Sequence, residues 1–136
     1  MDTDFSNPNL IIMVDDNYAD RFIAGRVFKN TGLEHSFLAM ESGRELLEYL
    51  DEAKSGKRPI PSAILLDINM PGLNGFEVLR ELRAQEEFQD RPPITMFTNS
   101  DRMEDRQLSM ELGANDFRTK PTDLNVYADV FRSLVA

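Results

Sequence analysis

Short apolar runs alternate along the chain with longer stretches that mix apolar and charged residues. The runs lie at residues 10–14, 36–39, 63–66, 94–97 and 115–118. The first, third and fourth runs are nearly continuous in apolar residues, which is typical of strands that are covered on both faces, as in a parallel sheet. We therefore predict five strands at these positions.

The stretches that follow these runs carry apolar residues at helical spacing. The fourth helix is expected to end at Gly113, because glycine commonly stops a helix. A bundle of helices alone is the alternative, but the runs are too short and too regularly interleaved for it. Five repeats of strand and helix predict an α/β fold, with a five-stranded parallel sheet and helices on both faces. The five helical stripes are Ile23, Val27 and Phe28; Leu46, Leu47, Leu50 and Ala53; Val78, Leu79 and Leu82; Leu108, Met110 and Leu112; and Leu124, Tyr127, Phe131 and Leu134.

The length of 136 residues suits one compact domain. We expect a short N-terminal tail over residues 1–9 and one domain over residues 10–136. Residues 54–62 mix charge, glycine and two prolines. This composition indicates an exposed loop between the second helix and the third strand rather than a domain boundary. The chain has no cysteine, which excludes disulfides and thiolate metal sites.

The formal net charge of −9 limits the classes of partner. Such an acidic surface repels nucleic-acid phosphates and anionic membranes, so we expect neither as a partner. The N-terminus lacks the basic start and apolar stretch of a signal peptide, and no apolar run approaches the length of a membrane-spanning helix. We therefore expect a cytoplasmic protein.

Polar residues that carry chemistry follow the predicted strands. Asp15 and Asp16 follow the first strand, Asp67 the third, Thr98 the fourth and Lys120 the fifth. The carboxyl ends of parallel strands lie at one edge of a sheet, and ligands bind there. We therefore expect these side chains to converge.

Three carboxylates at one edge repel one another. They could share a proton, which raises the pKa of one of them. They could instead hold a hard divalent cation such as Mg²⁺, which prefers carboxylate, water and phosphate oxygens. The backbone carbonyl of Asn69 could add one more oxygen to the carboxylates of Asp15, Asp16 and Asp67.

An ammonium and a hydroxyl at the same edge would suit an anionic phosphoryl group. Lys120 could pair with such a group, and Thr98 could donate a hydrogen bond to it. Phosphoryl transfer depends mainly on positioning and charge neutralisation, and a carboxylate can serve as the nucleophile. Asp67 is therefore the candidate for an aspartyl-phosphate.

With these residues in place, the chain resembles the receiver domains of two-component response regulators over nearly its whole length. The resemblance implies a flavodoxin-like (βα)5 fold with strand order 2-1-3-4-5. It also implies a stand-alone phosphorylation switch that catalyses only its own phosphorylation and dephosphorylation. The segments that carry it are Val14-Asp15-Asp16, residues 65–75, residues 97–100 and residues 113–121.

The resemblance assigns a role to each matching residue. Asp67 would accept the phosphoryl group from a sensor histidine kinase or a histidine phosphotransfer protein, and a downstream protein would read the result. Lys120 would contact the phosphoryl group, and the Lys120–Pro121 peptide bond would be cis. Thr98 and Phe117 would act as switch residues, with Phe117 turning inward on activation. The implied ligands of Mg²⁺ or Mn²⁺ are Asp16 directly, Asp15 partly through water, Asp67, and the carbonyl of Asn69.

Two features depart from the family pattern. Asn99 is bulkier than the small residue that is common beside the switch threonine, and it could narrow access to the phosphoryl group. The loop at residues 54–62 is longer than in the shortest members, and it resembles that of small regulators that work with phytochrome-like kinases.

Each assignment has a simpler structural alternative. The pair Asp15 and Asp16 could begin a helix, Thr98 could cap one, and Lys120 could be a surface lysine. Asp67 could belong to a turn, and Phe117 could be a core aromatic.

The last predicted helix has a wide apolar face. Val126, Val130 and Val135 lie beside its core stripe. The helix could simply be well buried, or it could form a homodimer surface with the fourth helix and the fifth strand.

Two other functional classes are alternatives to a receiver domain. A pseudo-receiver would bind partners without phosphorylation, but it would be expected to lack Asp67, one acid of the first pair, or Lys120. A metal-dependent aspartyl phosphatase usually carries a second Asp two residues after its nucleophile, where this chain has Asn69.

Overall fold

Five parallel strands form a single sheet in the order β2-β1-β3-β4-β5. This computed structural model describes residues 9–135 of the chain. The predicted fold class and strand order are confirmed. The strands are β1 (Leu10–Val14), β2 (Ser36–Met40), β3 (Ala63–Leu66), β4 (Ile94–Thr98) and β5 (Asp116–Thr119).

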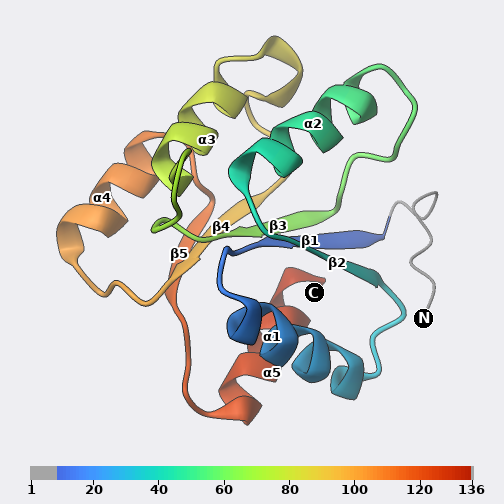
Figure 1. Ribbon diagram of the computed structural model, residues 1–136, viewed down its shortest axis with the longest axis vertical. Coiled ribbons are helices and arrows are strands. Elements are labelled where there is room, and N and C mark those ends of the chain that lie inside the picture. The colour runs from blue at the N-terminus through green and yellow to red at the C-terminus, as the bar shows by residue number, and fades with distance from the viewer. Residues whose placement is uncertain (1–8, 136) are drawn as a thin grey trace.

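Helices cover both faces of the sheet, as predicted (Figure 1). On one face lie α1 (Tyr18–Thr31) and α5 (Leu124–Leu134). On the other lie α2 (Gly43–Lys54), α3 (Gly75–Arg83) and α4 (Met103–Glu111). A short 3-10 turn, η1 (Glu86–Phe88), follows α3. Among residues 9–135, none of the helices combines the length and the apolar character that crossing a bilayer requires.

The core consists of two apolar layers separated by the sheet. Side chains alternate between the two faces of a strand, and all five residues of β1 are buried. Leu10, Ile12 and Val14 pack into the layer beneath α2 and α3. Ile11 and Met13 pack into the layer beneath α1 and α5. Burial on both faces explains why the central strands are continuous apolar runs in the sequence.

Some of the predicted helical stripes are only partly buried. In α1 the buried residues are Ala24, Val27 and Phe28, while Ile23 is 41% exposed. Its neighbour Ala24 takes the inward position beside Val27 and Phe28, so of the predicted stripe only Ile23 is exposed. At the start of α5, Leu124 is 62% exposed.

The fourth helix is packed more loosely than its sequence suggested. Leu108 and Leu112 are half-buried and Met110 is 45% exposed, while Ser109 is buried. The helix ends at Glu111, and Leu112 is its C-cap. Gly113 follows with a φ of 104°, a left-handed conformation that favours glycine and that accounts for the stop.

Two further expectations concern the chain's backbone. The cis peptide bond within residues 9–135 is Arg91–Pro92, so the expectation of a cis Lys120–Pro121 bond was wrong. That expectation came from resemblance alone, and trans is the preferred geometry of an X–Pro bond. Of the expected tail at residues 1–9, residues 1–8 lie outside the described part of the chain. The domain bounds of 10–136 therefore remain a prediction.

Candidate functional site

Asp15 directly follows β1 in the interior of the molecule, with no exposed surface. Its Oδ1 accepts a hydrogen bond from the backbone N–H of Asn17 at 2.9 Å. Asn17 is the N-cap of α1, so it rather than Asp15 or Asp16 begins this helix. The Arg21 side chain returns from α1 and donates to the carbonyl oxygen of Asp15 at 2.8 Å. These bonds fix the turn that presents the first acidic pair.

Asp67 follows β3 directly and is also largely buried, with a side-chain exposure of 9%. Its backbone N–H donates to the carbonyl of Val14, which keeps it beside the end of β1. Its Oδ1 accepts the N–H of Ile68 at 2.8 Å, which orients the carboxylate toward the edge of the sheet. At the first position of α3, Gly75 lies so close that an added Cβ would be 2.3 Å from the carbonyl oxygen of Asp67.

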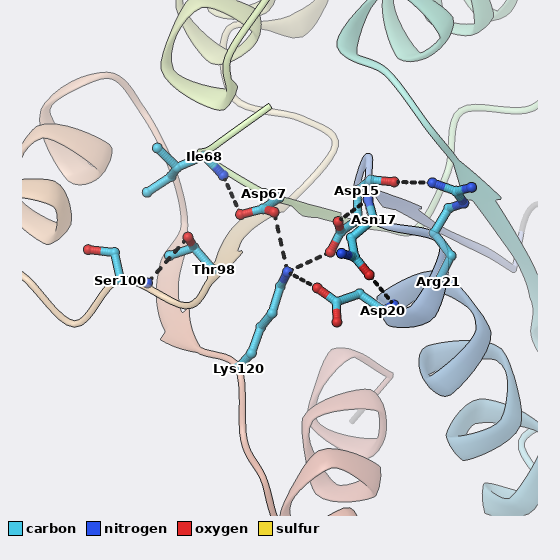
Figure 2. A network of polar contacts seen from close by, with 9 residues as sticks. All are labelled: Asp15, Asn17, Asp20, Arg21, Asp67, Ile68, Thr98, Ser100 and Lys120. Atoms are coloured by element: carbon cyan, nitrogen blue, oxygen red, sulfur yellow. Dashed lines mark hydrogen bonds and ion pairs between the residues drawn. The ribbon is translucent and has the colours of Figure 1, made fainter. Parts of the chain in front are cut away.

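Lys120 follows β5 and reaches across the edge of the sheet to both acids (Figure 2). Its Nζ lies 2.5 Å from Oδ2 of Asp15 and 3.2 Å from Oδ2 of Asp67. A third contact, of 2.8 Å, joins it to Oδ2 of Asp20. The backbone N–H of Lys120 donates to the carbonyl of Thr98 at 2.7 Å, which anchors the base of the side chain. Lys120 is therefore not a surface lysine, and only 8% of its side chain is exposed.

The charges at this edge influence one another strongly. Burial raises the pKa of Asp15, and hydrogen bonds from Lys120 and Asn17 only partly oppose it. Burial also tends to lower the pKa of Lys120. The hydrogen bonds to Asp15 and Asp20, together with the charge of Asp67, outweigh that effect and hold the Lys120 pKa above its ordinary value. The lysine therefore stays a cation at any physiological pH.

Three carboxylates are placed to hold a cation. Oxygen atoms of Asp15, Asp16 and Asp67 all lie within 4.8 Å of one another. Two of these acids are buried, whereas Asp16 is exposed and faces solvent. An all-oxygen donor set that is open to water on one side suits Mg²⁺ or Mn²⁺, which retain water ligands. Asn69, two residues after Asp67, is exposed, whereas its neighbours Ile68 and Met70 are buried.

Thr98 ends β4 and is fully buried. Its hydroxyl oxygen accepts a 3.4 Å hydrogen bond from the N–H of Ser100. It does not cap α4, because Arg102 is the N-cap of that helix. Thr98 thus lies next to the site, at the strand end between those that bear Asp67 and Lys120 (Figure 2).

Phe117 lies within β5 and is only 3% exposed, packed in the core layer beneath α2 and α3. The Arg106 guanidinium of α4 lies over its ring at 5.4 Å and donates to its backbone carbonyl. The ring is therefore already in the inward arrangement. The structural alternative, a core aromatic, describes this conformation.

Asp20 is the residue of the site that sequence reasoning missed. It lies in the first turn of α1, and its backbone N–H donates to the side chain of Asn17. A signal was present, because a helix that starts at Asn17 places its first turn beside the end of the preceding strand. Asp20 differs from the other acids in following no strand directly.

Comparisons with known proteins agree with this geometry. Residues 11–131 match the family described as the response regulator receiver domain. The chain is 31% identical over 132 residues to the response regulator Rcp1 of Synechocystis sp., covering 96% of this chain and 87% of Rcp1. The crystal structure of the Mn²⁺-bound form of Rcp1 superimposes with a TM-score of 0.78 at 28% identity, over 93% of this chain and 91% of that one.

A second solved structure is similar to the same extent. It is the phosphorylated cyanobacterial phytochrome response regulator RcpA, with a TM-score of 0.78 and 27% identity. The match covers 93% of this chain and 90% of RcpA. The weak resemblance to regulators of phytochrome-like kinases therefore has a counterpart among the solved structures.

Proposed function

This chain belongs to the response regulator receiver family, and from that premise we propose that it accepts a phosphoryl group on Asp67 with the help of Mg²⁺ or Mn²⁺. The observation that carries the proposal is the position of the Lys120 ammonium, which contacts Asp15 and Asp67 at one edge of the sheet. A pseudo-receiver would not require this set of residues to be complete.

The chemistry follows from the contacts. A carboxylate oxygen of Asp67 attacks the phosphorus of a phosphohistidine, the P–N bond breaks, and the imidazole leaves. Lys120 faces the carboxylate and balances the charge of the phosphoryl oxygens. A divalent cation bound by Asp15, Asp16, Asp67 and the Asn69 carbonyl would neutralise further charge. Hydrolysis of the aspartyl-phosphate would reset the protein, so the reaction acts on the chain itself and not on a released substrate.

We propose that Thr98 and Phe117 form the switch. The Thr98 hydroxyl would turn from the N–H of Ser100 toward the phosphoryl group. Phosphorylation would then favour the inward arrangement of Phe117, which this structure shows. Such a population shift needs two arrangements that differ in their affinity for the phosphoryl group.

The donor would be a sensor histidine kinase or a histidine phosphotransfer protein, and a downstream protein would bind the switched face. The similarity to RcpA, a cyanobacterial phytochrome response regulator, makes a kinase of the phytochrome type a reasonable first donor to assay. We propose a cytoplasmic protein without nucleic-acid or membrane partners, in keeping with the net charge of −9.

We also propose a homodimer through the face of α4, β5 and α5. Apolar side chains are exposed on this face: Val126 of α5 at 50%, and Met103 and Met110 of α4 at 77% and 45%. Val130 is buried and belongs to the core, so only part of the apolar face of α5 remains for a partner.

The proposed phosphorylation can be tested by intact mass. The protein is incubated with Mg²⁺ and a small phosphodonor such as phosphoramidate. We expect wild type and Asp51→Asn, which alters a distant exposed acid of α2, to gain one phosphoryl group. Asp67→Asn should gain none. The same gain in Asp67→Asn, or no gain in wild type, would rule out the proposed acceptor.

A further inference from the structure

The Lys120 ammonium is shared among three carboxylates. A lysine ammonium has three N–H donors, and the three contacts to Asp15, Asp20 and Asp67 account for all of them. The distances are unequal. Nζ lies at 2.5 Å from Asp15 and 2.8 Å from Asp20, but 3.2 Å from Asp67. The ammonium therefore lies nearer to Asp15 and Asp20 than to the proposed acceptor Asp67 (Figure 2).

Asp20 differs from the other two acids in its expected role during the reaction. Asp67 would become the acyl phosphate, and Asp15 belongs to the proposed metal ligands. Asp20 belongs to neither group, so it would keep its contact with the ammonium throughout the reaction cycle. It is also held in place, because its backbone N–H donates to the N-cap side chain of Asn17 at 2.9 Å.

We propose that Asp20 is a positioning residue that competes with the phosphoryl group for the Lys120 ammonium and thereby restrains phosphorylation of Asp67. This inference rests on the proposed function. A phosphoryl group on Asp67 needs the Lys120 ammonium close to that residue, whereas Asp20 holds the ammonium on the side of α1. The negative charge of Asp20 also repels the incoming phosphoryl oxygens at close range.

The Asp20 carboxylate should, by contrast, strengthen the binding of the divalent metal ion. Its charge attracts a divalent cation bound at the neighbouring acids. Asp20 also binds the Lys120 ammonium. Without Asp20, this ammonium would compete more strongly with the divalent metal ion for the carboxylates of Asp15 and Asp67. Loss of the charge should therefore speed phosphoryl capture and weaken metal binding. A variant that merely disturbed the site would impair both.

The test uses Asp20→Asn, which removes the charge and keeps the shape and one oxygen acceptor. With phosphoramidate and saturating Mg²⁺, we expect the phosphorylation rate, followed by intact mass, to rise by on the order of threefold. Without phosphodonor, the Mg²⁺ affinity, measured by titration calorimetry, should fall by a similar factor on the order of threefold. Asp51→Asn makes the same change in net charge on α2 and should alter neither quantity.

Asp20→Glu tests the role of charge separately from that of shape. It keeps the charge on a longer side chain, and its phosphorylation rate should lie near that of wild type. An Asp20→Asn rate equal to or below that of wild type would overturn the inference, as would an unchanged Mg²⁺ affinity. Wild type that takes up no phosphoryl group would instead refute the proposed function, so the two failures are distinguishable.

Discussion

At the scale of single residues, the electrostatics of the site depend on the buried Lys120 ammonium and its contacts with three carboxylates. Asp15 is fully buried and makes the shortest of the three contacts with Lys120. Even so, burial raises its pKa above the ordinary value of 3.8. For Asp15 itself, the contact with Lys120 does not fully offset the loss of solvation, whereas the same contact helps to raise the pKa of Lys120.

Replacing Asp15 by Asn should stabilise the metal-free protein at pH 7. The pKa of Asp15 is higher in the folded than in the unfolded chain, so the ionised carboxylate opposes folding above the folded pKa, and this effect disappears as pH falls through it. The melting temperature of Asp15→Asn should exceed that of wild type at pH 7, and the difference should shrink toward pH 4.

Bound Mg²⁺ should reverse the order of stability, so that wild type becomes more stable than Asp15→Asn. At a Mg²⁺ concentration of about 100 times the dissociation constant, wild type should gain about 2.7 kcal/mol of stability. Asp15→Asn has lost one proposed ligand and should gain much less. A variant that is less stable than wild type at pH 7 without metal would show that the pair with Lys120 outweighs the burial of Asp15.

The residues that sequence reasoning found and the one it missed differ in a physical way. Asp15, Asp67 and Lys120 directly follow strands, and parallel strands bring their carboxyl ends together whatever the intervening sequence. Asp20 reaches the site through the orientation of α1, which depends on the cap at Asn17 and on packing. The contact between the Arg106 guanidinium of α4 and the ring of Phe117 in β5 joins two elements, and no periodicity in the sequence encodes it.

At the scale of elements, the start of α3 is locked against the end of β3. Gly75 of α3 donates its N–H to the carbonyl of Ile68, and a Cβ on Gly75 would be 2.9 Å from Cα of Ile68. Asn74 and Glu77 form a capping box that fixes the first turn of the helix. The loop that carries Asp67 is therefore held by close backbone contact.

Gly75→Ala should move this loop, because backbone atoms cannot yield as a flexible side chain can. We expect a loss of roughly 1–3 kcal/mol in the free energy of unfolding, measured by urea denaturation, and slower phosphorylation.

Gly25→Ala is the matched control. Its Cβ would meet nothing nearer than 4.0 Å, and it lies inside α1. It should stabilise the protein by about 0.5–1 kcal/mol. Equal stability of the two variants would contradict the close approach.

Arg83, the last residue of α3, joins three later segments of the chain: η1, the loop before β4, and the loop between α4 and β5. Its guanidinium donates to the carbonyls of Phe88, Pro92 and Gly113 and to the side chain of Asn115. Lysine has the charge but not the planar set of donors. Arg83→Lys should therefore lower the free energy of unfolding by roughly 1–3 kcal/mol, while Arg80→Lys, on the exposed side of α3, should stay within about 0.5 kcal/mol. Similar losses in both variants would argue against a stabilising role for these contacts of the Arg83 guanidinium.

The elements that the sequence predicted best are those buried on both sides. β1, β3 and β4 were recognisable as apolar runs because both of their faces lie in the core. α4 was predicted less well, since its only buried residue is Ser109 and its apolar side chains remain partly in water. A helix held so loosely leaves a weak stripe in the sequence.

At the scale of the whole molecule, the surface beside β5 carries the face through which the proposed dimer would form. Beside β5, Val126 borders a hollow of the surface together with Arg106 and Arg118. If this face pairs two copies, Val126→Glu should shift a dimer to monomer in light scattering at the same protein concentration, because a buried carboxylate without a partner is costly. Leu124→Glu alters an exposed leucine that borders a different hollow, beside Lys120, and should leave the assembly unchanged. A wild type that is monomeric at high concentration in both phosphorylation states would end the dimer proposal.

The position of the phosphoryl group along the chain is the most direct test of Asp67 as the metal-dependent acceptor. The protein is phosphorylated in Mg²⁺, the acyl phosphate is reduced with borohydride, which converts the modified Asp to homoserine, and the peptides are sequenced by mass spectrometry. We predict homoserine at Asp67 alone, and none when the metal is chelated beforehand. Homoserine at Asp15 or Asp16, or a yield that is indifferent to the metal, would contradict the account.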